Sequence, residues 1–142
     1  ILKEFEVSFG LEVTSAHRSP ERTLNLVKEA EAEGTRVFIA VAGKAAHLAG
    51  VVAAHTVRPV IGVPVESVPL AGLDALFSTV QMPKGIPVAS MALGQHGGTN
   101  AALFAVEILA LEDDRLRKKL VAYRKKMADK VESASKKIQG KL

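Results

Sequence analysis

Two adjacent residues, His17 and Arg18, combine a side chain that can move a proton with one that can hold an anion. An imidazole titrates near pH ~6.5 in model peptides, so it can both donate and accept a proton at neutral pH. The arginine guanidinium stays charged and offers a planar fork to a phosphate or a carboxylate. The pair would suit an anionic substrate and one proton transfer, although position alone leaves open a loop histidine and an exposed arginine without a role.

A second stretch whose residues could take part in binding or catalysis is residues 43–48, Gly-Lys-Ala-Ala-His-Leu, which follow an apolar run. Small side chains such as Ala45 and Ala46 let a ligand approach the backbone, and a helix beginning just after Gly43 would favour an anion. His47 adds a second imidazole in the first turn of that predicted helix. The alternative is a small-residue turn that serves only tight packing.

The other two histidines, His55 and His96, lack such a setting. His55 falls in the last turn of the helix predicted to contain His47, about 12 Å away at 1.5 Å per residue, which is too far for a shared metal ion. His96 lies in a glycine-flanked loop. Because the chain has no cysteine and no close cluster of histidines and carboxylates, we expect no metal site. Without a G-x-G-x-x-G or Walker loop we also expect no nucleotide cofactor.

Strand and helix patterns alternate along the chain, which predicts an α/β fold with a doubly wound parallel sheet and helices on both faces. The first residues, Ile1, Leu2 and Phe5, have the spacing of a last helical turn, and residues 7–14 alternate like an extended strand. Further strands are expected at residues 37–41, 59–63 and 86–91, and helices at 20–34, 45–56, 70–80, 101–111 and from Asp113-Asp114 onward.

The predicted order of elements places both chemical stretches at one edge of the sheet. In doubly wound sheets, ligands bind beyond the carboxyl ends of the strands. The turns expected there cover residues 15–19, 43–47, 62–67 and 92–98. Ser19 is a good N-cap and Pro20 a good first residue for the helix that follows the first of these turns.

The composition is typical of a single globular domain with a core of small aliphatic residues. Of 142 residues, 48% are hydrophobic but only 4% are aromatic, so Ala, Val and Leu must fill the core. No run reaches the ~18 apolar residues of a membrane span, and no basic-then-apolar leader is present. We therefore expect a cytoplasmic protein that does not bind a membrane.

Charge is divided unevenly along the chain. Residues 115–142 hold eleven Lys/Arg and two acids, a net charge of +9, whereas residues 1–114 have a net charge of −5. A basic tail is one signature of nucleic-acid binding. The regular apolar stripe and the scarcity of aromatics favour instead a helix that packs on a neighbour, with no nucleic-acid partner. The stripe consists of Leu116, Leu120, Tyr123, Met127, Val131, Ala134 and Ile138.

Four blocks of the chain together resemble the PurE family, 5-(carboxyamino)imidazole ribonucleotide mutase of purine biosynthesis. The resemblance covers residues 1 to about 124. The blocks are Ser-Ala-His-Arg-Ser-Pro-Glu-Arg (15–22), Ala-Gly-Lys-Ala-Ala-His-Leu-Ala-Gly (42–50), Pro-Val-Ile-Gly-Val-Pro (59–64) and Gly-Leu-Asp-Ala-Leu-Phe-Ser-Thr-Val-Gln-Met-Pro-Lys-Gly-Ile-Pro-Val (72–88).

The resemblance implies a flavodoxin-like three-layer α/β/α sandwich, a homo-octamer and a cofactor-free transfer of a carboxylate from an exocyclic amine to a ring carbon. His17 matches the family's general acid/base, and Arg18 matches a substrate-phosphate contact. Ser15 and Ala16 are implied substrate-binding residues of the same turn. The residues that match the loop closing over the substrate base and its carboxylate are Gly43, Lys44, Ala45, Ala46, His47 and Leu48.

Residues 45–48 favour the mutase over the related carboxylase branch, which uses free carbon dioxide and differs in this stretch. Two positions depart from the family pattern: Lys44 stands where many members have glycine, and Ala49 replaces a common proline. The carboxylase activity remains an alternative, as does a non-catalytic module that binds nucleic acid through the basic tail.

The family's N-terminal strand and its Gly-Ser-Asp-Ser-Asp phosphate loop do not occur in the printed sequence. We therefore expect an N-terminally incomplete α/β catalytic domain over residues 1–112. Residues 113–142 are expected to form a basic amphipathic helix that packs on neighbouring subunits.

Overall fold

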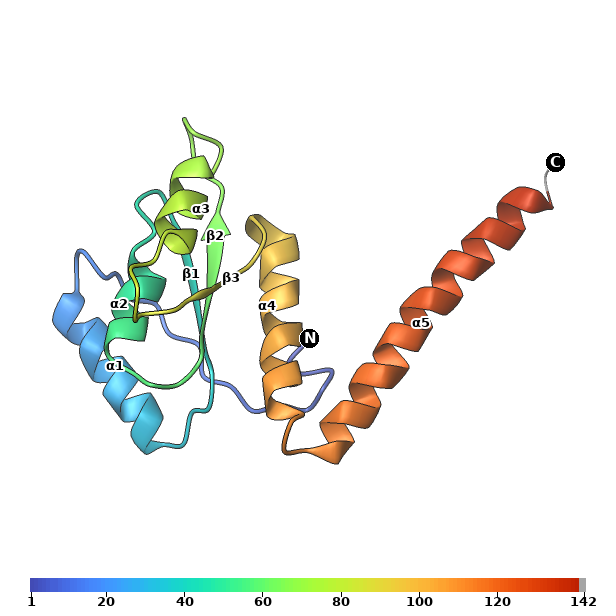
Figure 1. Cartoon of the computed structure of the whole chain (residues 1–142), viewed down its shortest axis with the longest axis horizontal. Coiled ribbons are helices and arrows are strands. Elements are labelled where there is room, and N and C mark those ends of the chain that lie inside the picture. The colour runs from blue at the N-terminus through green and yellow to red at the C-terminus, as the bar shows by residue number, and fades with distance from the viewer. Residues whose placement is uncertain (141–142) are drawn as a thin grey trace. The chain divides into compact units, whose positions relative to one another are not determined.

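The computed structural model describes residues 1–140 of the chain. It contains a parallel sheet of the strands β1, β2 and β3, in that order (Figure 1). The chain divides into two units, Ile1–Ala105 and the residues from Val106 onward, and the sheet belongs to the first. In chain order the elements are α1 (Pro20–Ala32), β1 (Phe38–Gly43), α2 (Leu48–Ala54), β2 (Val60–Val65), α3 (Leu73–Val80), β3 (Ala89–Ser90), α4 (Gly94–Leu109) and α5 (Asp114–Gln139).

Helices cover both faces of this sheet, as the alternation of strands and helices predicts. At Gly62 in β2, an added Cβ would collide with Thr79 of α3 and lie 3.2 Å from the Cβ of Ala49 in α2. The next residue, Val63, points to the other face, where its Cγ1 lies 3.2 Å from the Cβ position of Gly97 in α4. Successive side chains of a strand alternate between faces, so β2 is buried on both sides.

Small and aliphatic side chains build the core, in agreement with the composition. The central strand contributes Ile61, which is 0% exposed, and α2 lies against the sheet through the small side chains of Ala49 and Ala53. Close approach of a helix to a sheet requires such small residues. One buried cluster joins α1, β1, α2 and β2 through Val27, Ala40, Ala49, Val52, Ala53 and Val60.

Residues 1–7 make the helical turn that the spacing of their apolar residues predicts. The Val7 N–H bonds the Leu2 carbonyl and the Glu6 N–H bonds the Lys3 carbonyl, each at 3.0 Å. Glu6 has a φ of 58°. This pair of bonds around a left-handed residue is the Schellman motif that ends helices. Phe5 in the same turn is only 2% exposed.

The strand predicted at residues 7–14 is wrong. The segment forms no ladder with another strand of the described residues, and its alternate side chains Phe9, Leu11 and Val13 are 49%, 86% and 87% exposed. A strand needs a neighbour for its backbone N–H and C=O groups, whereas a period of two in the sequence reports only which side chains share a face.

Two helices begin at places that differ from the prediction. The helix α2 starts at Leu48 and not at residue 45, so His47 is its N-cap and does not lie in its first turn. The helix α4 starts at Gly94 and not at residue 101. Gly97, taken as part of a loop, is a helical residue whose added Cβ would collide with the carbonyl of Ala92. A glycine that permits close packing was thus mistaken for a glycine that breaks a helix.

The remaining boundaries shift by a few residues for local reasons. The helix α3 begins only after Gly72, whose φ of 86° is left-handed. Pro64 does not close β2 but lies inside it opposite Ala42, since its fixed φ fits extended backbone. The strand β3 is reduced to Ala89–Ser90, because the nearby Pro87 has no N–H for the ladder.

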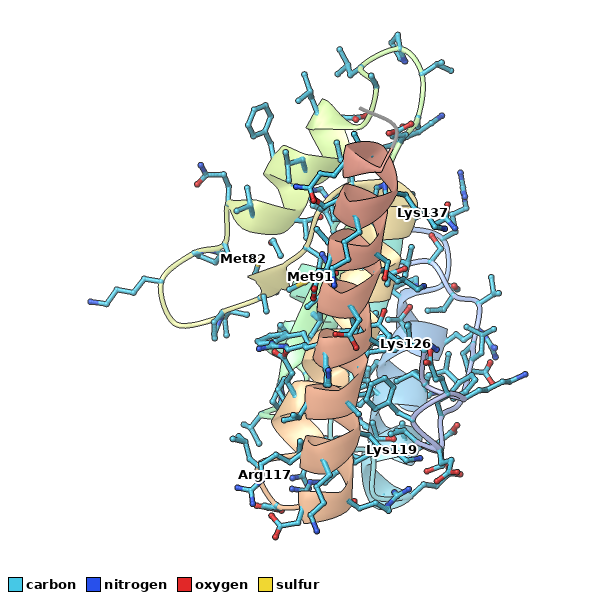
Figure 2. The ribbon with its side chains drawn as sticks, turned by 90° about the vertical axis from the view of Figure 1, so that its right-hand side faces the viewer. Met82, Met91, Arg117, Lys119, Lys126 and Lys137 are labelled. Atoms are coloured by element: carbon cyan, nitrogen blue, oxygen red, sulfur yellow. The ribbon has the colours of Figure 1, made fainter. Side chains whose placement is uncertain are left out.

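The last helix, α5, starts as predicted at an acidic N-cap. The Asp113 carboxylate accepts hydrogen bonds from the N–H groups of Arg115 (2.8 Å) and Leu116 (3.2 Å). Ion pairs one turn apart, such as Lys125 with Asp129, run along its charged face. Figure 2 shows Lys119, Lys126 and Lys137 following one another along this helix. Within residues 1–140 no helix combines the length and apolar character needed to cross a membrane.

Candidate active site

The turn at residues 15–19, which carries His17, lies directly before α1 and is closed by hydrogen bonds between its ends. The Ser19 N–H bonds the Ser15 carbonyl at 2.9 Å, and the Ser15 N–H bonds the Ser19 hydroxyl at 3.1 Å. The Ser15 hydroxyl accepts a bond from the Arg18 N–H at 3.2 Å. Ser19 is the N-cap of α1 as predicted, but its hydroxyl turns back to Ser15 and does not cap the helix N–H groups.

The loop at residues 43–48 begins where β1 ends and is shaped by small residues. An added Cβ on Gly43 would lie 3.0 Å from Val65 Cγ2, so the neighbouring strand leaves little room there. Lys44 follows with a φ of 56°, in the left-handed region that favours glycine. The His47 N–H then bonds the Ala45 carbonyl at 2.8 Å and turns the chain into α2.

The turn and the loop meet at their histidines. His17 Nε2 lies 2.8 Å from His47 Nδ1, the distance of a good hydrogen bond, and the two rings are almost perpendicular with centroids 4.9 Å apart. Both side chains are exposed. One ring nitrogen must donate and the other accept, so the bond requires that at least one of the two rings be neutral. The arrangement holds one proton at the surface between two imidazoles.

Two cations accompany this pair, as the sequence predicts. Arg18 belongs to the turn and Lys44 to the loop, and both side chains are exposed. Neither forms an ion pair with any part of the chain that the structure describes, so both charges are open to an anionic ligand. An arginine fork can take two oxygens of a phosphate, whereas a lysine acts as a point charge.

The small residues of the predicted site differ in what they present to solvent. Ala45 is exposed, Leu48 is half-buried, and Ala46 is 2% exposed, so Ala46 offers a ligand only its backbone. In the turn, Ser15 and Ala16 are half-buried. All predicted site residues therefore lie in two segments that the His17–His47 contact brings together.

The other two histidines are not part of this contact. His55 is the C-cap of α2, at the end of the helix opposite to His47. His96 is an exposed residue of α4, so the prediction that it lies in a loop is wrong. Over residues 1–140, no group of three or more His, Asp and Glu side chains could hold a metal ion.

Sequence reasoning missed the hydroxyl groups behind the turn. The Thr14 and Thr23 hydroxyls are 2.8 Å apart, although nine residues separate them in the chain. Thr23 is 1% exposed on α1, among the helix residues that face inward. The helical period places Thr23 on the buried face, but no local pattern pairs it with Thr14.

Comparison with known proteins agrees with the fold and with the motifs. A family profile described as AIR carboxylase matches residues 1–130, so the chain belongs to the AIR carboxylase family. The crystal structure of Treponema denticola PurE superimposes with a TM-score of 0.87 at 30% identity, covering 96% of this chain and 84% of that one. The flavodoxin-like α/β fold with a long C-terminal helix is thereby confirmed.

Two relatives of this chain are named as the same enzyme. The N5-carboxyaminoimidazole ribonucleotide mutase of Methanocaldococcus jannaschii is 54% identical over 139 residues, which make up 98% of this chain and 85% of that protein. The mutase of Escherichia coli K12 is 48% identical over 131 residues, 92% of this chain and 78% of that protein. The predicted membership of the PurE family is confirmed.

Proposed function

We propose that this chain is an isomerase of purine biosynthesis that moves the carboxylate of N5-carboxyaminoimidazole ribonucleotide from the exocyclic amine to a ring carbon. The observation that carries the proposal is the exposed hydrogen bond of 2.8 Å between His17 and His47, flanked by two free cations. High identity to mutases over nearly the whole chain supports the same reaction.

The reaction needs one group that gives a proton and takes one back. In the first step the N–C bond of the substrate breaks, carbon dioxide leaves, and the exocyclic nitrogen takes a proton from His17. In the second step the ring carbon forms a bond to carbon dioxide, and the proton of that carbon passes to His17. The enzyme returns to its first state, so no cofactor is required. A positioned imidazole contributes about 10²- to 10⁴-fold to such proton transfers.

His47 orients this proton carrier through its hydrogen bond. Because the bond to His47 Nδ1 occupies His17 Nε2, the His17 ring exchanges its proton with the substrate through Nδ1. The acid form carries a proton on both ring nitrogens, and the base form keeps the proton on Nε2, which His47 accepts, and has a free lone pair on Nδ1. His47 thus keeps His17 in place while the proton moves.

The two cations bind the substrate, and the small residues of the loop retain the carbon dioxide. Arg18 binds the substrate phosphate, with Ser15 and Ala16 beside it, and Lys44 attracts the substrate carboxylate before it is released as carbon dioxide. The loop at residues 43–48 closes over the base, where Ala45, the Ala46 backbone and the Leu48 side chain exclude water and retain carbon dioxide.

The proposal includes a cytoplasmic homo-octamer, with the catalytic domain at residues 1–112 and a tail at 113–142 that packs on neighbouring subunits. Its support is the apolar stripe of α5, where Met127, Val131 and Ile138 are 46%, 72% and 65% exposed in the single chain. Replacing Met127 and Val131 together by lysine should lower the assembly mass in light scattering. An unchanged mass would contradict the role of the stripe.

Assays of two substrates separate the mutase from the carboxylase, the second candidate, whose reaction appears in the description of the family profile. We expect turnover of the carboxyamino substrate without added bicarbonate. Turnover of aminoimidazole ribonucleotide should be seen only at high bicarbonate, where the reaction runs from free carbon dioxide. Activity confined to the second assay would replace the mutase by the carboxylase.

A further inference from the structure

Three hydroxyl groups lie behind the 15–19 turn, and the proposed chemistry gives them no role. Thr14 precedes the turn, Ser19 ends it, and Thr23 stands one helical turn further on in α1. The Thr23 hydroxyl donates to the Ser19 carbonyl at 3.1 Å and lies 2.8 Å from the Thr14 hydroxyl. The Thr14 hydroxyl is also 3.3 Å from the Ser19 hydroxyl.

Counting protons assigns a direction to these bonds, because each hydroxyl can donate only once. The Ser19 proton goes to the Ser15 carbonyl at 3.1 Å, and the Thr23 proton goes to the Ser19 carbonyl. The Thr14 proton is then donated to Thr23 Oγ1 at 2.8 Å. In this assignment Thr23 both donates and accepts, so it ties the strand-like segment before the turn to the residue that ends it.

The position of His17 depends on this arrangement because both ends of its turn are held by it. Thr14 is the residue before Ser15, and Ser19 is bonded to Ser15 through backbone and side chain. Residues 7–14 belong to no sheet of the described chain, so side chains of α1 hold their last residues in place. With Thr23 at 1% exposure, water does not compete for these bonds.

We propose that Thr23 is a positioning residue for the proton transfer: its hydroxyl holds the 15–19 turn where the His17 ring meets His47. The inference rests on the proposed function for its kinetic part only. Thr23 touches neither substrate nor a reacting atom, and it acts through Thr14 and Ser19. A misplaced proton carrier lowers the rate of the chemical step more than the affinity for the substrate.

The chain offers a matched control in Thr79 of α3. Its side chain is also buried, at 3% exposure, and its hydroxyl also donates to the carbonyl four residues earlier, Ala75, at 2.7 Å. Within residues 1–140 it has no hydroxyl partner, and α3 does not carry the turn. Thr23→Val and Thr79→Val therefore each remove a hydrogen bond from a threonine hydroxyl to the carbonyl four residues earlier. Only Thr23→Val also removes the contact with the Thr14 hydroxyl.

The test compares Thr23→Val, Thr23→Ser and Thr79→Val by steady-state kinetics and by ¹⁵N NMR of the histidine rings without substrate. We expect Thr23→Val to lower kcat about 10-fold with KM within about twofold, as displacement of a catalytic group does. It should also change the ring-nitrogen signals of His17 and His47. Thr23→Ser, which keeps the hydroxyl, should restore both, and Thr79→Val should alter neither.

Two results would overturn the inference: a Thr23→Val protein with the kinetics and ring signals of Thr79→Val, or a loss of kcat that Thr23→Ser fails to restore. If Thr23→Val does not fold, Thr14→Val decides, because it removes the other partner of the 2.8 Å contact at a half-buried position. The NMR readout needs no turnover. If the unaltered protein shows no mutase activity, the proposed function is contradicted. The positioning role of Thr23 is then tested by the ring-nitrogen signals alone.

Discussion

The two halves of the candidate site are built in opposite ways. The 15–19 turn is cross-linked by backbone and hydroxyl hydrogen bonds that continue into α1. The 43–48 loop is defined by a glycine against a strand, two alanines and a lysine at a φ of 56°. The difference indicates that the 15–19 turn holds His17 in a fixed position, whereas the 43–48 loop adapts to the substrate. Changes that displace the His17 ring, in the turn or at His47, should therefore affect kcat, and changes to the cations Arg18 and Lys44 should affect binding.

The largest effect is expected from His17→Asn, which keeps a polar side chain of similar size but cannot move a proton. We expect kcat to fall at least about 100-fold, the scale of a lost general acid/base. KM should stay within a few-fold because the proposed phosphate contact of Arg18 remains. A variant with undiminished turnover in a coupled assay would show that the proton carrier lies elsewhere.

A smaller loss is expected from His47→Phe, which keeps a ring but removes the 2.8 Å bond. Because the bond orients His17 without itself moving the proton to the substrate, we expect kcat to fall about 10- to 30-fold, within the range of one strong hydrogen bond. His55→Phe is the control, since His55 stands at the other end of the same helix. Equal rates for the two variants would remove the orienting role of His47.

Substrate binding is the property that Arg18→Gln should change. Loss of the guanidinium fork should raise KM about 10-fold with little change in kcat, and the affinity of the unaltered protein should weaken as salt rises. The control is Arg58→Gln, at an exposed arginine that lies 3.9 Å from Glu31 and precedes β2. A fall in kcat at constant KM would instead place Arg18 in the chemical step.

The smallest effect, and the one that sharpens the contrast between turn and loop, is expected from Lys44→Gly. A left-handed backbone costs a residue with a Cβ about 1–2 kcal/mol, and the greater entropy of unfolded glycine offsets about 0.5–1 kcal/mol of this cost. We expect the free energy of unfolding to rise by about 0.5–1 kcal/mol in urea melts, while the lost cation raises KM slightly. Destabilisation would mean that the lysine side chain contributes more than the backbone strain costs.

The sequence was sufficient for the parts of the fold that local patterns and chain order determine. The apolar period and the capping residues predicted α1 and α5, and the parallel sheet followed from the alternation of elements. The strand at residues 7–14 was wrong because a strand exists only with a partner, which its own residues do not specify. The early start of α4 was missed because glycine also permits the close approach of Gly97 to the Ala92 carbonyl and to Val63, which the sequence does not distinguish from a helix break.

The site shows the same limit. The candidate residues could be named from their types and from the motifs that resemble the family, and both segments were assigned to one edge of the sheet; their roles stay predictions. That His17 and His47 would touch at 2.8 Å could not be read from residues thirty positions apart. The link between Thr14 and Thr23 was likewise hidden, since a buried threonine on a helix has no feature that distinguishes a positioning role from simple packing.

The central claim is that the carboxylate moves within one closed site, with His17 carrying the proton. The direct test supplies the carboxyamino substrate labelled with ¹³C in its carboxylate, in the presence of excess unlabelled bicarbonate, and measures ¹³C in the product. The account predicts that the product retains the label, because the 43–48 loop keeps carbon dioxide beside the ring carbon. A product diluted to the isotopic composition of the bicarbonate would contradict it.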